Sequence, residues 1–314
     1  MLKKLRWLIP LILIFIVASV YLVPSPHKAF DELYADVDTE TVASLTRFRQ
    51  THPVQTLVVN GVEWKYLVMG DRSPLNNPPI LFLHGMTGAH DIWWQQMEAL
   101  QNEYRVISVT YPAVNSLGEM EQGVMAILDA EGVEHFYIVG SSLGGYFAQY
   151  LITQYPNIIW GAVFANTFPP NDIIAERNKT IGALLPYLPK WLVMNVLSGS
   201  MRESVYPASG NSELVLAFGL EQTYGRMSKA QVLGRFRCVV EPFEAPDMAV
   251  LGIPVMIIEA DNDPLVEAAL REQLKETYPT AKVVTLNNGH FPYLSMPDEY
   301  TGYLRDFFGD IKLR

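Results

Sequence analysis

The chain has 314 residues, of which 49% are hydrophobic and 18% charged, so it can bury a sizeable core and is not a disordered protein. Its 33 acidic and 23 basic side chains give a net charge of −10. This argues against a nucleic-acid-binding protein, because phosphates are bound mainly by cationic side chains. The single cysteine, Cys238, excludes an intrachain disulfide framework and a cysteine-rich metal site.

The N-terminus carries basic residues and then an uncharged stretch, Trp7–Val23. As a helix this stretch would be about 25 Å long, close to the thickness of a hydrocarbon core. We therefore expect residues 1–27 to form a single-pass N-terminal membrane anchor, with the body on the non-cytoplasmic side. A cleaved signal sequence and a secreted protein is the alternative, which the lack of a clear A-x-A site disfavours.

Two features precede the main body of the chain. Residues 28–50 are polar with spaced apolar side chains, which predicts a stalk or lead-in helix; a plain linker is the alternative. Residues 56–70 alternate in polarity around Asn60-Gly61, which predicts a β-hairpin.

From residue 80 onward, strand-like and helix-like segments alternate. The expected strands are residues 80–83, 104–110, 135–139, 158–165, 253–259 and 282–286. The expected helices are residues 91–101, 117–131, 146–155, 265–277 and 297–308. This rhythm predicts an α/β fold with a mostly parallel sheet and helices on both faces. The alternation is interrupted at residues 169–250, where the sequence looks helical throughout. We interpret this stretch as an inserted helical lid between core segments 51–168 and 251–314; an ordinary extra helical layer is the alternative.

The pentapeptide Gly140-Ser141-Ser142-Leu143-Gly144 follows an apolar strand and opens a helix. This is the context of a nucleophile elbow, in which glycines permit a sharp turn and the serine projects from the sheet edge. The alternative is a tight glycine-rich turn with an inert serine. We predict that Ser142 is a nucleophile.

His290 follows the last predicted strand, at the same edge of the sheet as Ser142. An imidazole there can accept and return the serine proton. A carboxylate is needed to orient it, and three acids follow the preceding strand. We choose Asp263, because the chain needs a few residues to turn before the next helix; Asp261 is second and Glu259 third. Asp172, where the lid begins, is a more distant candidate.

A second glycine-rich loop, His84-Gly85-Met86-Thr87-Gly88, follows the first central strand. Backbone amides of such a loop can bind a developing oxyanion. We predict that the amides of Met86 and Leu143 form this oxyanion hole. The alternative is a glycine-rich turn without a catalytic role.

On the segments LFLHGMTG, IVGSSLGG, EADNDPLV and NNGHFPYL, the chain resembles the α/β-hydrolase superfamily from about Thr56 onward. It resembles the maspardin family more closely, on the segments DIWWQQMEAL, YRVISVTYP, GSSLGGYFAQ, CVVEP and HFPYL. The resemblance implies an eight-stranded sheet, a lid and a Ser142–His290–Asp263 triad. Two positions differ from many hydrolases: Tyr111-Pro112 replaces an acidic loop, and Ala260 replaces a glycine.

Together these features predict a serine hydrolase that acts through an acyl-enzyme on a small-molecule carboxylic ester or related acyl substrate. It would need no cofactor and no metal. The first alternative is a maspardin-like, membrane-tethered binding or scaffold protein with little or no catalysis. The second keeps the triad but cleaves amides or carbon–carbon bonds. The sequence does not identify the substrate, because the lid shapes the pocket.

Overall fold

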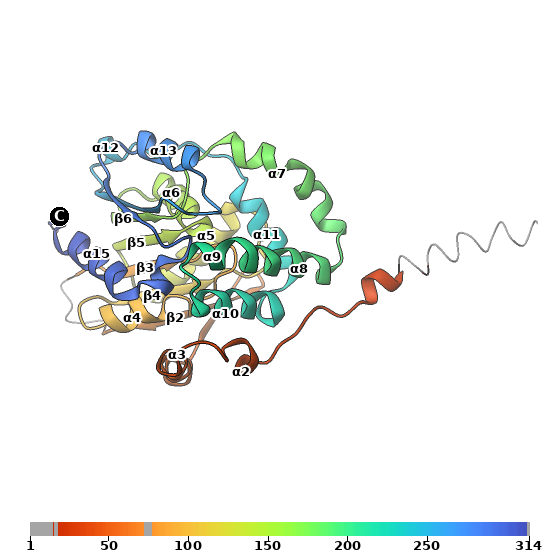
Figure 1. The fold of residues 1–314 in the computed structure, drawn as a ribbon. Coiled ribbons are helices and arrows are strands. Elements are labelled where there is room, and N and C mark those ends of the chain that lie inside the picture. Colours follow the sequence, from red (N-terminus) through yellow and green to blue (C-terminus); the bar gives the residue numbers. More distant parts are fainter. Residues whose placement is uncertain (1–14, 16–17, 72–76, 313–314) are drawn as a thin grey trace, which may run out of the picture.

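The structure is a computed structural model that describes residues 15, 18–71 and 77–312. Eight strands form one sheet in the order β1-β2-β4-β3-β5-β6-β7-β8 (Figure 1). The strands are β1 (Gln55–Val59), β2 (Val62–Met69), β3 (Ile80–Leu83), β4 (Val106–Thr110), β5 (Phe136–Ser141), β6 (Ile159–Ala165), β7 (Val255–Ala260) and β8 (Lys282–Leu286). β2 pairs antiparallel with β1 and β4, and all other pairs are parallel. The predicted α/β fold is therefore confirmed.

The central parallel strands are short apolar segments that are buried along their whole length. Every residue of β3, β5 and β7 is buried. Successive side chains of β3 enter two different hydrophobic clusters, with Ile80 and Phe82 in one and Leu81 and Leu83 in the other. Because side chains alternate across a strand, these clusters are the cores on the two faces of the sheet.

Helices of the core cover both faces. They are α4 (Trp94–Leu100), α5 (Leu117–Ala130), α6 (Leu143–Gln154), α13 (Ala268–Thr277), α14 (Pro292–Ser295) and α15 (Pro297–Gly309). α4 and α15 supply Trp94 and Leu304 to one cluster. α5, α6 and α13 supply Val124, Phe147 and Leu270 to the other.

The predicted hairpin at Asn60-Gly61 is confirmed. β1 and β2 pair from Gln55 opposite Tyr66 to Val59 opposite Val62. Asn60 and Gly61 both have positive φ, 51° and 80°. Two consecutive positive φ angles are typical of a type I′ turn, whose twist matches that of paired strands.

The inserted segment between β6 and β7 is helical, as predicted. It contains α7 (Asp172–Leu184), η1 (Leu185–Tyr187), α8 (Lys190–Ser200), η2 (Met201–Val205), α9 (Tyr206–Ala208), α10 (Glu213–Glu221), η3 (Gln222–Arg226), α11 (Lys229–Val239) and α12 (Met248–Leu251). α7 to α11 gather at one end of the sheet (Figure 1). Asn262, just after β7, donates a hydrogen bond to Ala208 O over 2.8 Å. The insertion therefore lies against the loops at the carboxyl ends of the strands.

The segment before the hairpin packs on the body as two helices, α2 (Phe30–Leu33) and α3 (Thr39–Thr51). Leu45 and Phe48 of α3 are completely buried. Arg49 of α3 lies 2.8 Å from both Asp91 Oδ2 and Glu221 Oε2. These contacts reach the core and the insertion at once, so the segment is a packed part of the fold and not an extended stalk.

The predicted membrane anchor is wrong. In the described part of the chain, no helix combines the length and apolar character needed to cross a bilayer. Residues 7–14, 16 and 17 of the expected span lie outside the described residues. The described helical turns at 18–22 end just before Pro24, where the chain becomes irregular. The expected single-pass topology, with its body on the non-cytoplasmic side, is therefore not supported.

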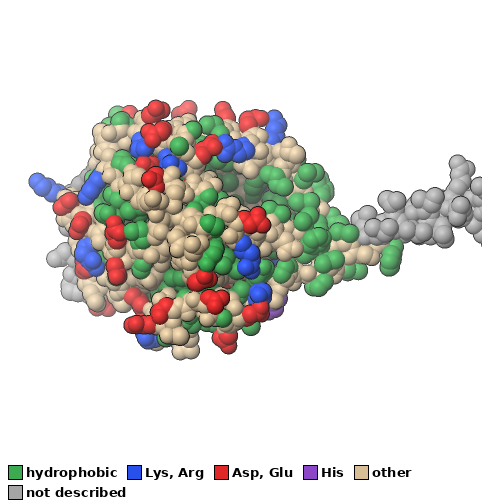
Figure 2. All heavy atoms as spheres, viewed as in Figure 1, with side chains coloured by type: hydrophobic (Ala, Val, Ile, Leu, Met, Phe, Trp, Pro, Cys, Tyr) green, Lys and Arg blue, Asp and Glu red, His purple; other side chains and the backbone are tan. Residues whose placement is uncertain are grey.

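The described N-terminal residues lie against the inserted helices. Trp191 of α8 donates a hydrogen bond to Val20 O over 2.8 Å. Figure 2 shows hydrophobic side chains gathered on this side of the molecule, where α7 and α8 lie. Leu184, Tyr187 and Val196 are exposed there.

Candidate active site

Ser142 lies in the sharp turn between β5 and α6, with φ 55° and ψ −122°. An L-residue rarely adopts this conformation, and such strain is found at functional positions. The flanking glycines permit the turn, because a Cβ at Gly140 would lie 2.2 Å from Gly144 O. Ser142 is half-buried, and no described residue forms a hydrogen bond with its hydroxyl. The hydroxyl is therefore free to meet a ligand.

His290 and Asp263 are brought together by the loops after β8 and β7. His290 Nδ1 lies 2.8 Å from Asp263 Oδ2 and 3.0 Å from Oδ1. The two residues are only 2% and 6% exposed, so the contact is shielded from water. Because a carboxylate only accepts, the proton of a neutral imidazole lies on Nδ1, which leaves Nε2 as the acceptor.

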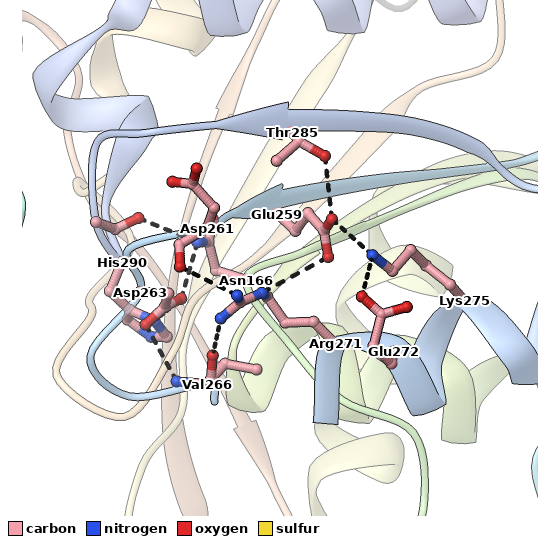
Figure 3. Close-up of polar contacts among 11 residues, drawn as sticks. Asn166, Glu259, Asp261, Asp263, Val266, Arg271, Glu272, Lys275, Thr285 and His290 are labelled. Carbon is pink, nitrogen blue, oxygen red and sulfur yellow. Dashed lines mark hydrogen bonds and ion pairs between the residues drawn. The ribbon is translucent and has the colours of Figure 1, made fainter. Parts of the chain in front are cut away.

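The other two candidate acids have different surroundings (Figure 3). Glu259 lies 3.0 Å from Lys275 Nζ and 3.8 Å from Arg271 Nε, in a separate ion-pair cluster. Asp261 is exposed, and its backbone carbonyl accepts from Arg271. Neither carboxylate contacts His290. Asp172 begins α7 and is also exposed.

Asp263 is kept ionised by its hydrogen bonds. Burial alone would raise the pKa of this carboxyl, but His290 and the side-chain amide of Asn166 outweigh burial and lower it. The backbone amides of Leu265 and Val266 add hydrogen bonds of 2.8 and 3.1 Å to Oδ1. A carboxylate with this many donors can orient an imidazole and stabilise its protonated form.

Asn166 is a site residue that the sequence motifs did not predict. It directly follows β6, and its side-chain amide donates to Asp263 Oδ2 over 2.9 Å and to Gly289 O over 3.1 Å. It therefore holds both the acid and the loop that carries His290. Its φ of 44° is a strained value that asparagine tolerates better than most residues. The sequence feature that could have identified Asn166 is a polar residue directly after a buried parallel strand.

The neighbours of Asn166 hold the nucleophile. Ala165 O accepts from the Ser142 amide over 2.9 Å, and the Thr167 hydroxyl donates to Ser142 O over 2.7 Å. Three consecutive residues at the end of β6, residues 165–167, thus connect the serine turn, the acid loop and the histidine loop.

The loop after β3 lies directly beside Ser142. A Cβ at Gly85 would stand 3.0 Å from Ser142 Cβ and 3.6 Å from its Oγ. The Met86 amide forms no hydrogen bond with the described residues. Leu143 is the first residue of α6, so its amide has no partner within the helix. Both amides that the sequence analysis chose are thus available as donors.

His84 orients the loop that carries the Met86 amide. Its Nδ1 lies 2.7 Å from Gly85 O, and the Tyr111 amide donates to its Nε2 over 3.4 Å. Burial and the neighbouring Arg235 hold the pKa of His84 well below its usual range, so the ring is neutral. Since a trans peptide directs its N–H opposite to its C=O, binding Gly85 O turns the Met86 N–H away from His84.

The structure does not join Ser142 directly to His290, because no hydrogen bond links the hydroxyl to the ring. Such contacts are often long without substrate. The described residues also contain no group of three His, Cys, Asp or Glu side chains arranged to hold a metal ion.

Comparisons with known proteins agree with this architecture. The family model described as "Alpha/beta hydrolase family" matches residues 80–302. The chain is similar to maspardin from Danio rerio, with 28% identity over 274 residues, covering 83% of this chain and 86% of that protein. It is 25% identical over 263 residues to a putative carbamate hydrolase RutD from Azorhizobium caulinodans, covering 74% and 92% of the two chains.

Among solved structures, the enol-lactonase from Burkholderia xenovorans LB400 is similar, with a TM-score of 0.69. The match covers 82% of this chain and all of that one at 17% sequence identity, which shows a shared fold.

Proposed function

Because this chain belongs to the alpha/beta hydrolase family, we propose that it is a serine hydrolase that cleaves a carboxylic ester or related acyl compound. The observation that carries the proposal is the buried contact of 2.8 Å between His290 Nδ1 and Asp263 Oδ2. The loops that carry these two residues are linked by hydrogen bonds through residues 165–167 to the strained turn of Ser142.

In the proposed mechanism, the Ser142 hydroxyl attacks the substrate carbonyl carbon while His290 Nε2 accepts its proton. The amides of Met86 and Leu143 bind the oxyanion that forms. The tetrahedral intermediate collapses as His290 returns the proton to the leaving group, which leaves an acyl-enzyme. Water then attacks the acyl carbon with His290 again as base, releasing the acid and restoring Ser142. Asp263 keeps the imidazole oriented throughout.

The substrate class follows from the chemistry and from the relatives. Attack by a serine on a carbonyl suits esters, lactones and carbamates, and the names of the similar proteins include a carbamate hydrolase and an enol-lactonase. We propose residues 169–250 as the lid that shapes the pocket above Ser142. The choice among acyl compounds then depends on the inserted helices.

A fluorophosphonate probe tests this function directly. The wild type should be labelled covalently, and Ser142→Ala should abolish labelling. With a panel of p-nitrophenyl esters of graded chain length, Ser142→Ala should lower kcat by on the order of 10⁶ if the three residues act as a unit. Ser141→Ala is the matched control, because Ser141 is fully buried and one residue away.

A binding or scaffold role without catalysis is the second candidate, favoured by the similarity to maspardin and by the missing bond between Ser142 and His290. It predicts a folded wild-type protein that is neither labelled nor active on any ester, amide or carbamate tested. Cleavage of amides or carbon–carbon bonds instead predicts labelling at Ser142 without ester turnover.

A further inference from the structure

Arg235 of α11 is a buried cation without a buried anion. It is 1% exposed, and no carboxylate of the described residues lies within ion-pair distance of its guanidinium. Its bonds instead reach three backbone carbonyls and one sulfur. Nη1 donates to Met86 O over 2.6 Å, to Gly88 O over 3.1 Å and to Met227 Sδ over 3.4 Å, and Nη2 donates to Tyr111 O over 3.0 Å. Arg235 Nε is buried without a hydrogen-bond partner among the described residues. Burying a charge is costly without an anion and a full set of hydrogen bonds, so this arrangement needs an explanation.

The three carbonyl acceptors belong to the two loops that shape the oxyanion site. Met86 and Gly88 lie in the loop beside Ser142, and Tyr111 supplies the amide that binds His84. The guanidinium also lies 5.7 Å from the centroid of the Tyr111 ring. Arg235 and His84 therefore bind three carbonyls of the same loop.

These bonds orient the proposed oxyanion donor. His84 binds Gly85 O, while Arg235 binds Met86 O and Gly88 O. The peptide planes on both sides of Met86 are thereby fixed, and so is the direction of the Met86 N–H.

The position of α11 is itself tightly set. A Cβ at Gly234 would lie 1.8 Å from Val114 O, so the helix backbone packs directly on the chain that follows β4. The fork-shaped guanidinium then reaches three carbonyls at once, which a lysine ammonium on a flexible stem does less well.

We propose that Arg235 is a positioning residue that fixes the oxyanion loop, so that the loop is competent only while α11 of the inserted segment is seated on the core. This inference rests on the proposed hydrolase function. Burial lowers the pKa of Arg235 to about 10, which still leaves it charged at neutral pH.

The test compares Arg235→Met and Arg235→Lys with Arg237→Met, since Arg237 is exposed on the same helix. Using the best p-nitrophenyl ester, Arg235→Met should lower kcat about 100-fold, the effect of losing one oxyanion donor, with KM changed less than about threefold. Inhibition by a trifluoromethyl ketone, which forms an oxyanion on Ser142, should weaken by a similar factor. Arg235→Lys should fall in between, and Arg237→Met should match the wild type.

Several outcomes would overturn the inference. A folded Arg235→Met with kcat within twofold of Arg237→Met is one. Equal losses of ester binding and ketone binding are another, because they would indicate a general pocket defect. If Arg235→Met does not fold, Arg235→Lys decides on the same criteria.

Failure of the proposed function gives a different result. In that case the wild type is not labelled by the fluorophosphonate, and hydrogen exchange decides the role of Arg235. Amides of residues 84–91 should exchange faster in Arg235→Lys than in Arg237→Met. Unchanged exchange there would show that Arg235 does not hold the loop.

Discussion

The side-chain amide of Asn166 donates to Asp263 Oδ2, the same oxygen that lies 2.8 Å from His290 Nδ1. The amide also binds Gly289 O, next to the histidine. One buried side chain after β6 thus sets the distance between two loops that follow β7 and β8. In the proposed mechanism, Asn166 positions the acid and the base without touching the substrate.

Asn166→Ala should lower kcat by roughly 10- to 100-fold, since a hydrogen bond to a charged group contributes about 1.5–3 kcal/mol. Because the lost bond favoured the ionised carboxylate, the pKa of Asp263 should rise. As the pH is lowered, the variant should therefore lose activity at a higher pH than the wild type does. A kcat–pH profile measures both effects. Asn178→Ala, on α7, is the control. Wild-type kcat in Asn166→Ala would contradict a positioning role.

Ser142→Gly should be more stable than Ser142→Ala by about 1 kcal/mol, although both lack the nucleophile. The φ of 55° strains any residue with a Cβ, and glycine relieves that strain. Urea unfolding of the two variants measures the difference. Position 141 is the matched control: Ser141 lies within β5 without a positive φ, so glycine there should be less stable than alanine. The same order at both positions would argue against strain at Ser142.

Gly88→Ala should destabilise the protein and reduce labelling of Ser142. Its Cβ would lie 2.4 Å from His84 Cβ and 2.6 Å from Cγ, so the ring must move and the Gly85–Met86 peptide with it. We expect a loss of about 1–3 kcal/mol in unfolding free energy, typical of overpacking. Gly199→Ala in α8 meets no atom within 4 Å and should be neutral or slightly stabilising. Equal effects of the two substitutions would contradict this account of the loop.

His90 should make stability depend on pH. Burial, with smaller effects of Arg226 and Arg49, lowers the pKa of His90 to about 4, despite the opposing charge of Asp91. Between pH 6.5 and 4 the unfolded chain binds a proton that the folded chain does not, so stability falls as pH decreases through this window. One such group contributes about 1.4 kcal/mol per pH unit.

The comparison is the loss of unfolding free energy between pH 7 and pH 5 in the wild type and in His90→Gln. The variant should lose roughly 2 kcal/mol less, because glutamine does not titrate. His27→Gln, at an exposed position, should behave as the wild type. A His90→Gln variant with unaltered pH dependence would rule out His90 as the source.

Much of this molecule could be predicted locally. The alternation of apolar strands and helices predicted the sheet, and Asn60-Gly61 predicted the hairpin turn. Periodicity and turn residues act over a few residues, so they can be read from neighbours in the chain. The prediction of an N-terminal membrane anchor was wrong, because an apolar stretch beside basic residues permits a spanning helix without requiring one.

The succession of strands and helices along the chain, the glycines around Ser142 and the place of His290 after the last strand were determined by the sequence itself. Only the tertiary structure shows which acid meets that histidine, since the three acids lie within five residues. Glu259 lies in β7 and pairs with Lys275, whereas Asp261 and Asp263 lie in the loop after it and only Asp263 contacts His290. The tertiary structure also brought in Asn166 and Arg235, whose partners are distant in sequence. Such contacts depend on how loops from separate strands and helices pack against one another, and no local pattern encodes that packing.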